Sequence, residues 1–187
     1  MSTLAIIGGV VGILACIPLL LAISNGLKQN MISFGLWATL ESMLAISLFE
    51  EKGEFIQLCG FALGSWLIVI LCITKKQKAS WGKLEFFVIF LIACCIIAWC
   101  LGGSLVAVVA TTCAITLAGI PQMLDIWKDP RNGSVPTWVL FEISNVLTFI
   151  GAKDWSIENR LFSGVGTIFC LIFVVLSLRT KNNSLTI

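Results

Sequence analysis

The stretch AGIPQMLDIWKDPRNGSVPTWVLFEISN, residues 118–145, decides the fold that we predict for this chain. An apolar segment runs into Pro121 and Gln122, breaks into a short charged loop, and re-enters apolar sequence that carries Glu142. A proline at a helix end and a lone carboxylate inside an apolar helix are typical of solute pathways through membranes. We therefore expect this stretch to form part of such a pathway.

The composition predicts an integral membrane protein. The 187 residues are 58% hydrophobic and 12% charged, with a mean hydropathy of +1.02, whereas a soluble domain is about 45–50% apolar. A helical span needs roughly 20 residues, so the chain has room for about seven spans. The apolar runs place them at residues 4–23, 31–49, 55–74, 84–101, 104–124, 135–151 and 161–178.

The distribution of positive charge predicts how the chain crosses the membrane. The N-terminal stretch lacks the basic start of a secretory signal, so we take it as the first span. With the N-terminus outside, the inner loops and tail hold nine Lys and Arg residues, and the outer loops hold three. By the positive-inside rule, we expect a multi-pass protein with its N-terminus outside and its C-terminus in the cytoplasm.

Several classes of function find no support in the sequence. The eight cysteines all lie in apolar segments, without a CxxC pair, and there is no histidine. We therefore expect no metal site and no cofactor. Neither a GxSxG motif nor a phosphate-cradling glycine loop is present, so we do not expect an enzyme. The scattered positive residues form no footprint for nucleic acid.

Three landmarks recur in the same order 101 to 103 residues later in the chain. Ser33-x3-Trp37-x3-Glu41 recurs as Ser134-x3-Trp138-x3-Glu142, Ile17-Pro18 as Ile120-Pro121, and Gly64-Ser65 as Gly166-Thr167. We infer two parallel triple-helix repeats joined by a linker helix, an arrangement of 3+1+3 transmembrane helices. The first repeat covers residues 1–74, the basic loop and linker helix 75–103, and the second repeat with the PQ motif and a short tail 104–187.

Glu41 and Glu142 are the strongest candidates for proton or cation coupling. A charged carboxylate inside the membrane is costly, and none of the predicted spans holds an interior Lys or Arg to pair with it. These glutamates are therefore either protonated at rest or facing a wet cavity. The alternative is a structural role, in which a protonated glutamate donates a hydrogen bond to a neighbouring helix.

The spacing of Trp138, Glu142 and Asn145 places them on one stripe of a helix. Trp37 and Glu41 repeat most of this stripe in the second span. We expect the two tryptophans and Asn145 to line a solute pocket, with the tryptophans stacking on a planar solute or closing one end. The tryptophans could equally belong to an interfacial aromatic belt.

Proline residues stand toward the inner ends of three spans, at Pro18, Pro121 and Pro136. Proline removes a backbone hydrogen bond and kinks a helix, so each of them is a candidate hinge. Pro136 could instead be an ordinary residue of a first helical turn. Gly35 occupies the place in the second span that corresponds to Pro136.

The Pro121-Gln122 pair, the loop after it, Ser134 and the repeated frame resemble the PQ-loop transporters, and the wider layout is similar to the SWEET sugar carriers. The resemblance covers nearly all of the chain. It implies two three-helix units around a central solute site, with the prolines and Gly35 as hinges and Gln122 bearing on hinge motion. Where sugar carriers place asparagines, this chain has Ser65 and Thr167, which become further candidates for binding the solute. The paired glutamates look more like those of proton-coupled amino-acid exporters.

These observations lead us to expect a secondary transporter of a small polar solute, an amino acid or a sugar. Transport would be either coupled to protons or, as in a sugar facilitator, independent of them. Its partners would be the solute, protons and the lipid bilayer, and the sequence leaves a homo-oligomer open. The rival hypothesis is a non-transporting seven-span receptor or assembly factor, which would depend on charged loop residues such as Asp125, Lys128, Asp129 and Arg131.

Overall fold

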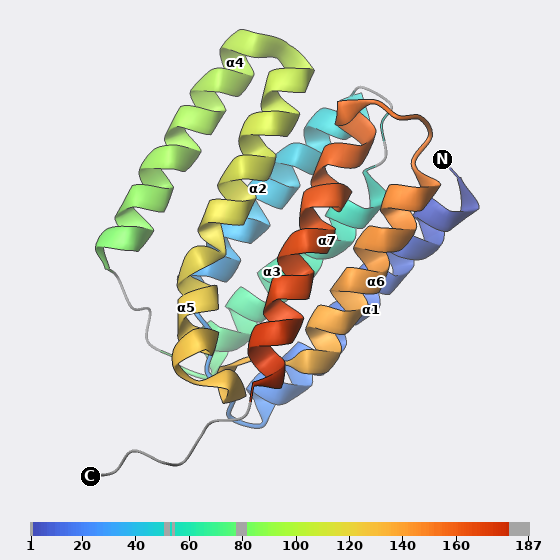
Figure 1. Ribbon diagram of the computed structural model, residues 1–187. Coiled ribbons are helices and arrows are strands. Elements are labelled where there is room, and N and C mark those ends of the chain that lie inside the picture. The colour runs from blue at the N-terminus through green and yellow to red at the C-terminus, as the bar shows by residue number, and fades with distance from the viewer. Residues whose placement is uncertain (1, 51–52, 54, 78–81, 180–187) are drawn as a thin grey trace.

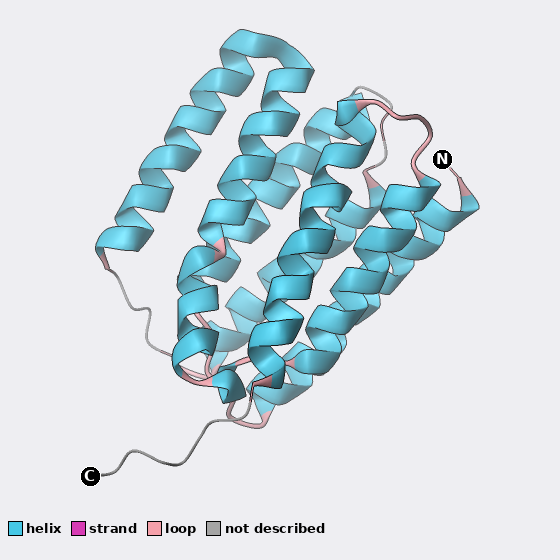
Figure 2. Ribbon diagram, viewed as in Figure 1, coloured by secondary structure: helices cyan, strands magenta, loops and turns pink. Residues whose placement is uncertain are grey.

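A computed structural model describes residues 2–179, except residues 51, 52, 54 and 78–81. Every regular element in this part of the chain is helical, so the predicted all-α fold is confirmed there (Figures 1 and 2). The elements are α1 (Thr3–Ser24), α2 (Met31–Glu50), α3 (Ile56–Thr74), α4 (Lys83–Ala118), α5 (Ile120–Lys128), the short 3-10 helix η1 (Pro130–Asn132), α6 (Val135–Gly151) and α7 (Ile157–Leu178).

Five stretches of the described chain are helical, long and apolar enough to cross a membrane. They are Thr3–Ser24, Met31–Phe49, Ile56–Thr74, Leu105–Lys128 and Ile157–Leu178, while Ile92–Gly103 and Val135–Gly151 are apolar but shorter. These lengths agree with the expectation of an integral membrane protein. Three lysines that enter the loop count for orientation, Lys52, Lys78 and Lys181, lie outside the described residues.

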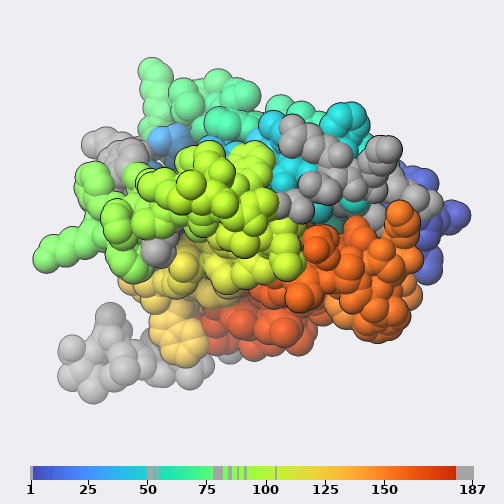
Figure 3. Space-filling view, turned by 90° about the horizontal axis from the view of Figure 1, so that it is seen from above, coloured from blue at the N-terminus to red at the C-terminus, as the bar shows by residue number. Residues whose placement is uncertain are grey.

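Helix α4 consists of two antiparallel arms that meet at Gly103 (Figure 1). Gly103 has φ +73° and ψ −173°, a conformation that is costly for any residue with a side chain. The turn lies between the predicted fourth and fifth spans. The first arm exposes large apolar side chains, among them Phe90 and Leu101, and α4 stands at the surface in the space-filling view (Figure 3). Such a surface suits contact with lipid.

We divide the helices by chain order into two sets, α1–α3 and α4–α7, which pack against each other. Helix α3 packs against both α1 and α2, whereas α7 packs against α4, α5 and α6. Across the two sets, α1 packs against α6, and α2 packs against α4 (Figure 1). A core of buried side chains from both sets packs between them.

Glycines allow α1 and α6 to approach closely. Gly8 and Gly12, four residues apart on α1, face Ser144 and Thr148 of α6. A Cβ atom on Gly8 would lie 2.5 Å from Thr148 Oγ1, and the Ser144 hydroxyl donates to Gly8 O at 2.7 Å. Small residues spaced in this way are typical of tightly packed membrane helices.

We call the end of the bundle that holds Pro121 and Gln122 the PQ end. The loop between α1 and α2, the last turn of α3, η1 and the start of α6 lie at this end, and the N-terminus lies at the opposite end (Figure 1). Pro18 lies inside α1, whereas Pro136 lies in the first turn of α6. Because the N–H groups of a first turn have no helical partner, Pro136 breaks no helical hydrogen bond.

Candidate functional site

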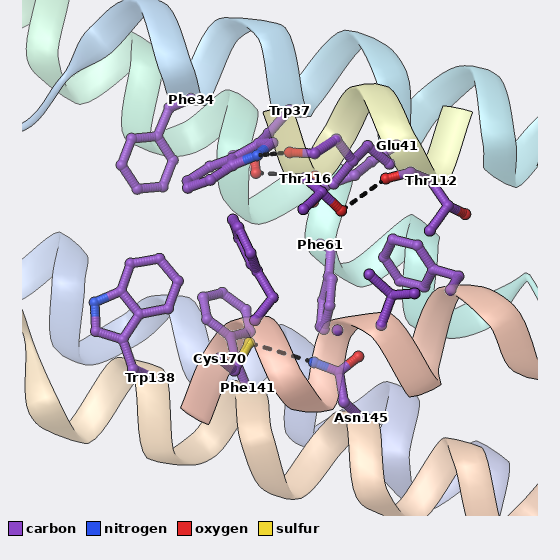
Figure 4. A pocket seen from close by; sticks show the side chains of 16 residues that line it. Phe34, Trp37, Glu41, Phe61, Thr112, Thr116, Trp138, Phe141, Asn145 and Cys170 are labelled. Atoms are coloured by element: carbon purple, nitrogen blue, oxygen red, sulfur yellow. Dashed lines mark hydrogen bonds between the residues drawn. The ribbon is translucent and has the colours of Figure 1, made fainter. Parts of the chain in front are cut away.

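A cavity lies between the two helix sets, with walls from α2, α3, α4, α6 and α7 (Figure 4). Its volume is about 60 Å³, which is room for a few water molecules. Its polar side chains are Glu41, Ser65, Thr112, Thr116 and Asn145, and its aromatic side chains are Phe34, Trp37, Phe61, Trp138, Phe141, Phe162 and Phe169. A solute larger than a few atoms would require the walls to move apart.

Glu41 is the acidic residue of the cavity wall. Its side chain is 6% exposed, and its Oε2 atom accepts a hydrogen bond of 3.0 Å from the Ser65 hydroxyl. Glu41 comes from α2 and Ser65 from α3, so this contact lies within one helix set. No lysine or arginine is among the residues that line the cavity. The structure thus brings together two residues that the sequence predicted separately for coupling and for solute binding.

Asn145 lies on the opposite wall, on α6 (Figure 4). Its Oδ1 atom accepts a hydrogen bond of 2.9 Å from Gln57 Nε2, and its Nδ2 atom donates to Cys170 Sγ at 3.4 Å. Gln57 also donates to Ser144 Oγ at 3.1 Å. Sequence reasoning missed Gln57, although a glutamine at the edge of an apolar span was a visible signal. Its role is to orient the Asn145 amide.

Trp37 and Trp138 belong to the interior of the bundle. They are 5% and 4% exposed, which excludes the interfacial-belt interpretation for these conformations. Their ring centroids lie 6.2 Å apart, and Trp138 stacks on Phe173 at 3.9 Å. Each tryptophan precedes Glu41 or Asn145 on a helix that starts at the PQ end. Together with Phe34, the two rings therefore close the cavity on the side of the PQ end.

Trp37 also supports the break between α4 and α5. Pro121 has no N–H to donate, and Gly119 N donates to Thr116 O, one residue nearer than in a regular α-helix. Trp37 Nε1 donates to Ile115 O at 2.8 Å, the carbonyl that Gly119 would otherwise occupy. The indole of α2 thereby satisfies a backbone group that the break leaves without a helical partner.

Glu142 and Thr167 are placed differently from the expectation, because neither is among the residues that line the cavity. Glu142 is half-buried, and its Oε2 atom is buried without a hydrogen-bond partner in the described part of the chain. Thr167 donates to Ser163 O on its own helix at 3.0 Å. At about 100° per residue, Glu142 is turned by about 40° from Trp138, and Asn145 by about 20° the other way. Of the predicted stripe, Trp138 and Asn145 therefore line the cavity, and Glu142 does not.

A polar network at the PQ end joins the two helix sets through Gln122. The Gln122 side chain is 1% exposed, and it donates to Gln29 Oε1 at 2.8 Å and accepts from Asn30 N at 3.2 Å. Gln29 in turn donates from Nε2 to Asn132 O at 2.8 Å. The predicted motif glutamine therefore ties the α1–α2 loop to the loop that follows α5.

Further contacts extend this network. Gln77 accepts a hydrogen bond of 3.0 Å from Gln29 N and donates to Leu27 O at 2.8 Å. Asn30 Nδ2 donates to Asp125 Oδ2 at 3.1 Å. We call Gln29, Asn30, Gln77, Gln122, Asp125 and Asn132 the PQ-end network. Sequence reasoning missed Gln29, Asn30 and Gln77, since their only signal was the presence of amides in both loops expected on the same side.

The other predicted hinge and loop residues have simpler surroundings. Gly35 makes no close packing contact, because a Cβ atom there would meet only a Val69 methyl group at 4.0 Å. Arg131 pairs with Asp129 at 2.6 Å on the surface, and the hydrogen bonds that its guanidinium donates to the Asp129 carboxylate raise the pKa of the guanidinium. An exposed pair of this kind contributes little to stability.

Comparison with known proteins gives no match: no family model, curated protein or solved structure resembles the chain significantly. The features that indicate a function are therefore the cavity, the residues in its walls and the PQ-end network.

Proposed function

We propose that this protein is a secondary transporter that moves a small polar solute across a membrane by alternating access. The observation that carries the proposal is a cavity between two helix sets, with the buried Glu41–Ser65 pair on one wall and the buried Asn145 on the other. Polar groups at the centre of an apolar bundle are energetically costly, so their presence indicates that function requires them. A passage for a solute supplies that requirement.

The proposed architecture is the 3+1+3 repeat of parallel three-helix units. One unit consists of α1, α2 and α3, and the other of the second arm of α4 with α5, α6 and α7. In support, α3 packs between its two neighbours in the first unit as α7 does in the second. Trp37 and Trp138 both line the cavity, as do Phe61 and Phe162, and each pair is separated by 101 residues. The first arm of α4 would be the linker.

The PQ-end network would be the gate of this transporter. Its hydrogen bonds connect the two proposed units just beyond the tryptophans, so the PQ end must release them to open. Each bond contributes only about 0.5–1.5 kcal/mol net, which binding of a solute can offset. The break at Gly119 and Pro121 supplies a flexible joint beside the network. With the N-terminus outside, this gate would face the cytoplasm.

Glu41 is a better candidate for proton coupling than Glu142. Its carboxyl group lines the cavity, where a solute or water can exchange a proton with it, and Ser65 orients it. Glu142 lies outside the lining. We therefore assign coupling to Glu41, and Glu142 becomes a matched control at an equivalent position of the repeat.

Uptake into liposomes tests the proposal. The purified protein would be reconstituted, and entry of labelled sugars, amino acids and organic amines followed with and without a pH gradient. Uptake that needs the gradient in wild type and in Glu142→Gln, but not in Glu41→Gln, supports a proton-coupled carrier. Sugar uptake that ignores the gradient in all three proteins supports a facilitator. If no solute enters, the proposal of transport fails and the receptor hypothesis gains ground.

A further inference from the structure

We infer that the cavity binds a small organic cation, an ammonium group enclosed by aromatic rings with Glu41 as its counter-ion. This inference rests on the proposed transport function and narrows the solute to one chemical class. It departs from the expectation of an amino acid or a sugar. Charge, aromatic surface and hydrogen bonding in the cavity each support it.

The charge of the cavity has one sign. Glu41 is the acid of the wall, and no lysine or arginine is among the lining residues. Glu41 acts electrostatically on two other ionisable side chains, the thiols of Cys16 on α1 and Cys170 on α7, and neither of them can carry a positive charge. An ionised Glu41 therefore needs its positive partner from outside the protein. A cation in the cavity meets this need.

The aromatic surface of the cavity suits a cation as well. Rings of both helix sets line the cavity together with Glu41, among them Trp37, Phe61 and Trp138 (Figure 4). The face of an aromatic ring attracts a cation, tryptophan most strongly, and the attraction grows where water is excluded. Cages of rings are also the usual site for quaternary ammonium groups. A sugar would instead need many polar partners.

The hydrogen-bond donors of the wall leave little for an anionic group. Ser65 donates to Glu41, Thr116 to Thr112 O, Trp37 to Ile115 O, and Asn145 Nδ2 to Cys170 Sγ. The Thr112 side chain is 3% exposed, and its Oγ1 atom has no hydrogen-bond partner in the described residues. One hydroxyl is enough to bind a hydroxyl or N–H of a ligand. It does not replace the positive group that the carboxylate of an amino acid would require.

Binding of three closely matched molecules to the purified protein tests this inference. Choline carries a permanent positive charge, betaine adds a carboxylate to the same trimethylammonium group, and 3,3-dimethylbutan-1-ol is the uncharged isostere of choline. Equilibrium binding of labelled choline would be measured directly, and the other two molecules would be used as competitors. Isopentylamine, leucine and isopentanol form a second series of the same design for a slimmer cation.

We expect each cation to bind at least about tenfold more tightly than its zwitterionic and neutral counterparts, because only the cation neutralises the buried carboxylate. Glu41→Gln should remove this preference, and Glu142→Gln should retain it. Comparing ligands on wild-type protein keeps the test valid if Glu41→Gln does not fold. Equal or tighter binding of betaine or leucine, or no binding of either cation, would overturn the inference. Transport of another solute in the liposome assay would still uphold the proposed function.

Discussion

Replacing Gln122 by leucine tests whether the PQ-end network holds that end of the bundle closed. The substitution introduces an apolar side chain of similar volume and removes two hydrogen bonds, to Gln29 Oε1 and from Asn30 N. Leaving a buried polar group unpaired costs about 1–3 kcal/mol. Because the network lies at the end of the bundle, we take the lower part of that range for each group. The closed arrangement should lose about 2–3 kcal/mol relative to the open one.

Hydrogen exchange measures this change directly. A loss of about 2–3 kcal/mol corresponds to opening that is about 30–150-fold more frequent. We expect faster amide exchange in residues 25–31 and 119–128 of detergent-solubilised protein. The backbone N–H of Gln29 is the best reporter, since it donates to Gln77 Oε1 and makes no hydrogen bond to Gln122 itself.

Gln57→Leu is the matched control for this experiment. Gln57 is also a buried glutamine with two side-chain hydrogen bonds, to Ser144 and Asn145, but it lies toward the other end of the bundle. It should leave exchange in residues 25–31 near the wild-type rate. If Gln122→Leu changes the exchange rate of residues 25–31 by less than about threefold, or if both variants accelerate it equally, a local gate at the PQ end is refuted.

Three further predictions concern the surroundings of the site. Gly119→Ala places a Cβ atom 2.1 Å from a phenylalanine ring of α7 and should cost about 1–3 kcal/mol, seen as a lower Tm, whereas Gly35→Ala should not lower it. Trp37→Phe leaves a backbone carbonyl of α4 unpaired and should cost about 1–3 kcal/mol in thermal melts, with the exposed Trp127→Phe as a neutral control. Hydrogen bonds from the loop and α7 lower the pKa of Asp154 from 3.8 to about 2, so its support of the α6–α7 loop should persist above pH 3.8 and disappear as the pH falls toward 2. Exchange of the loop amides over that pH range checks the last prediction, and unchanged protection down to pH 2 would contradict it.

The assignment of roles to the two glutamates shows how a repeat in sequence can mislead. Glu41 and Glu142 occupy matching places 101 residues apart, and the sequence treats them as equals. In the fold, Glu41 lines the cavity beside Ser65, and Glu142 lies outside its lining. A rotation of the helix about its axis by a fraction of a turn decides whether a side chain points into the cavity or beside it. Spacing along a helix is too coarse to predict which side of that boundary a residue takes.

The amino-acid sequence by itself determined the number and approximate bounds of the apolar helices, because lipid requires long apolar runs whose backbone groups are all paired within the helix. It also placed a break between residues 101 and 104, where the structure has a turn at Gly103 with a positive φ. Only the tertiary structure decided that Trp37 is buried against Ile115, and that Gln29 reaches Gln122. Those contacts join residues more than 70 positions apart, and they depend on how the helices rotate and pack against one another, which no local pattern encodes.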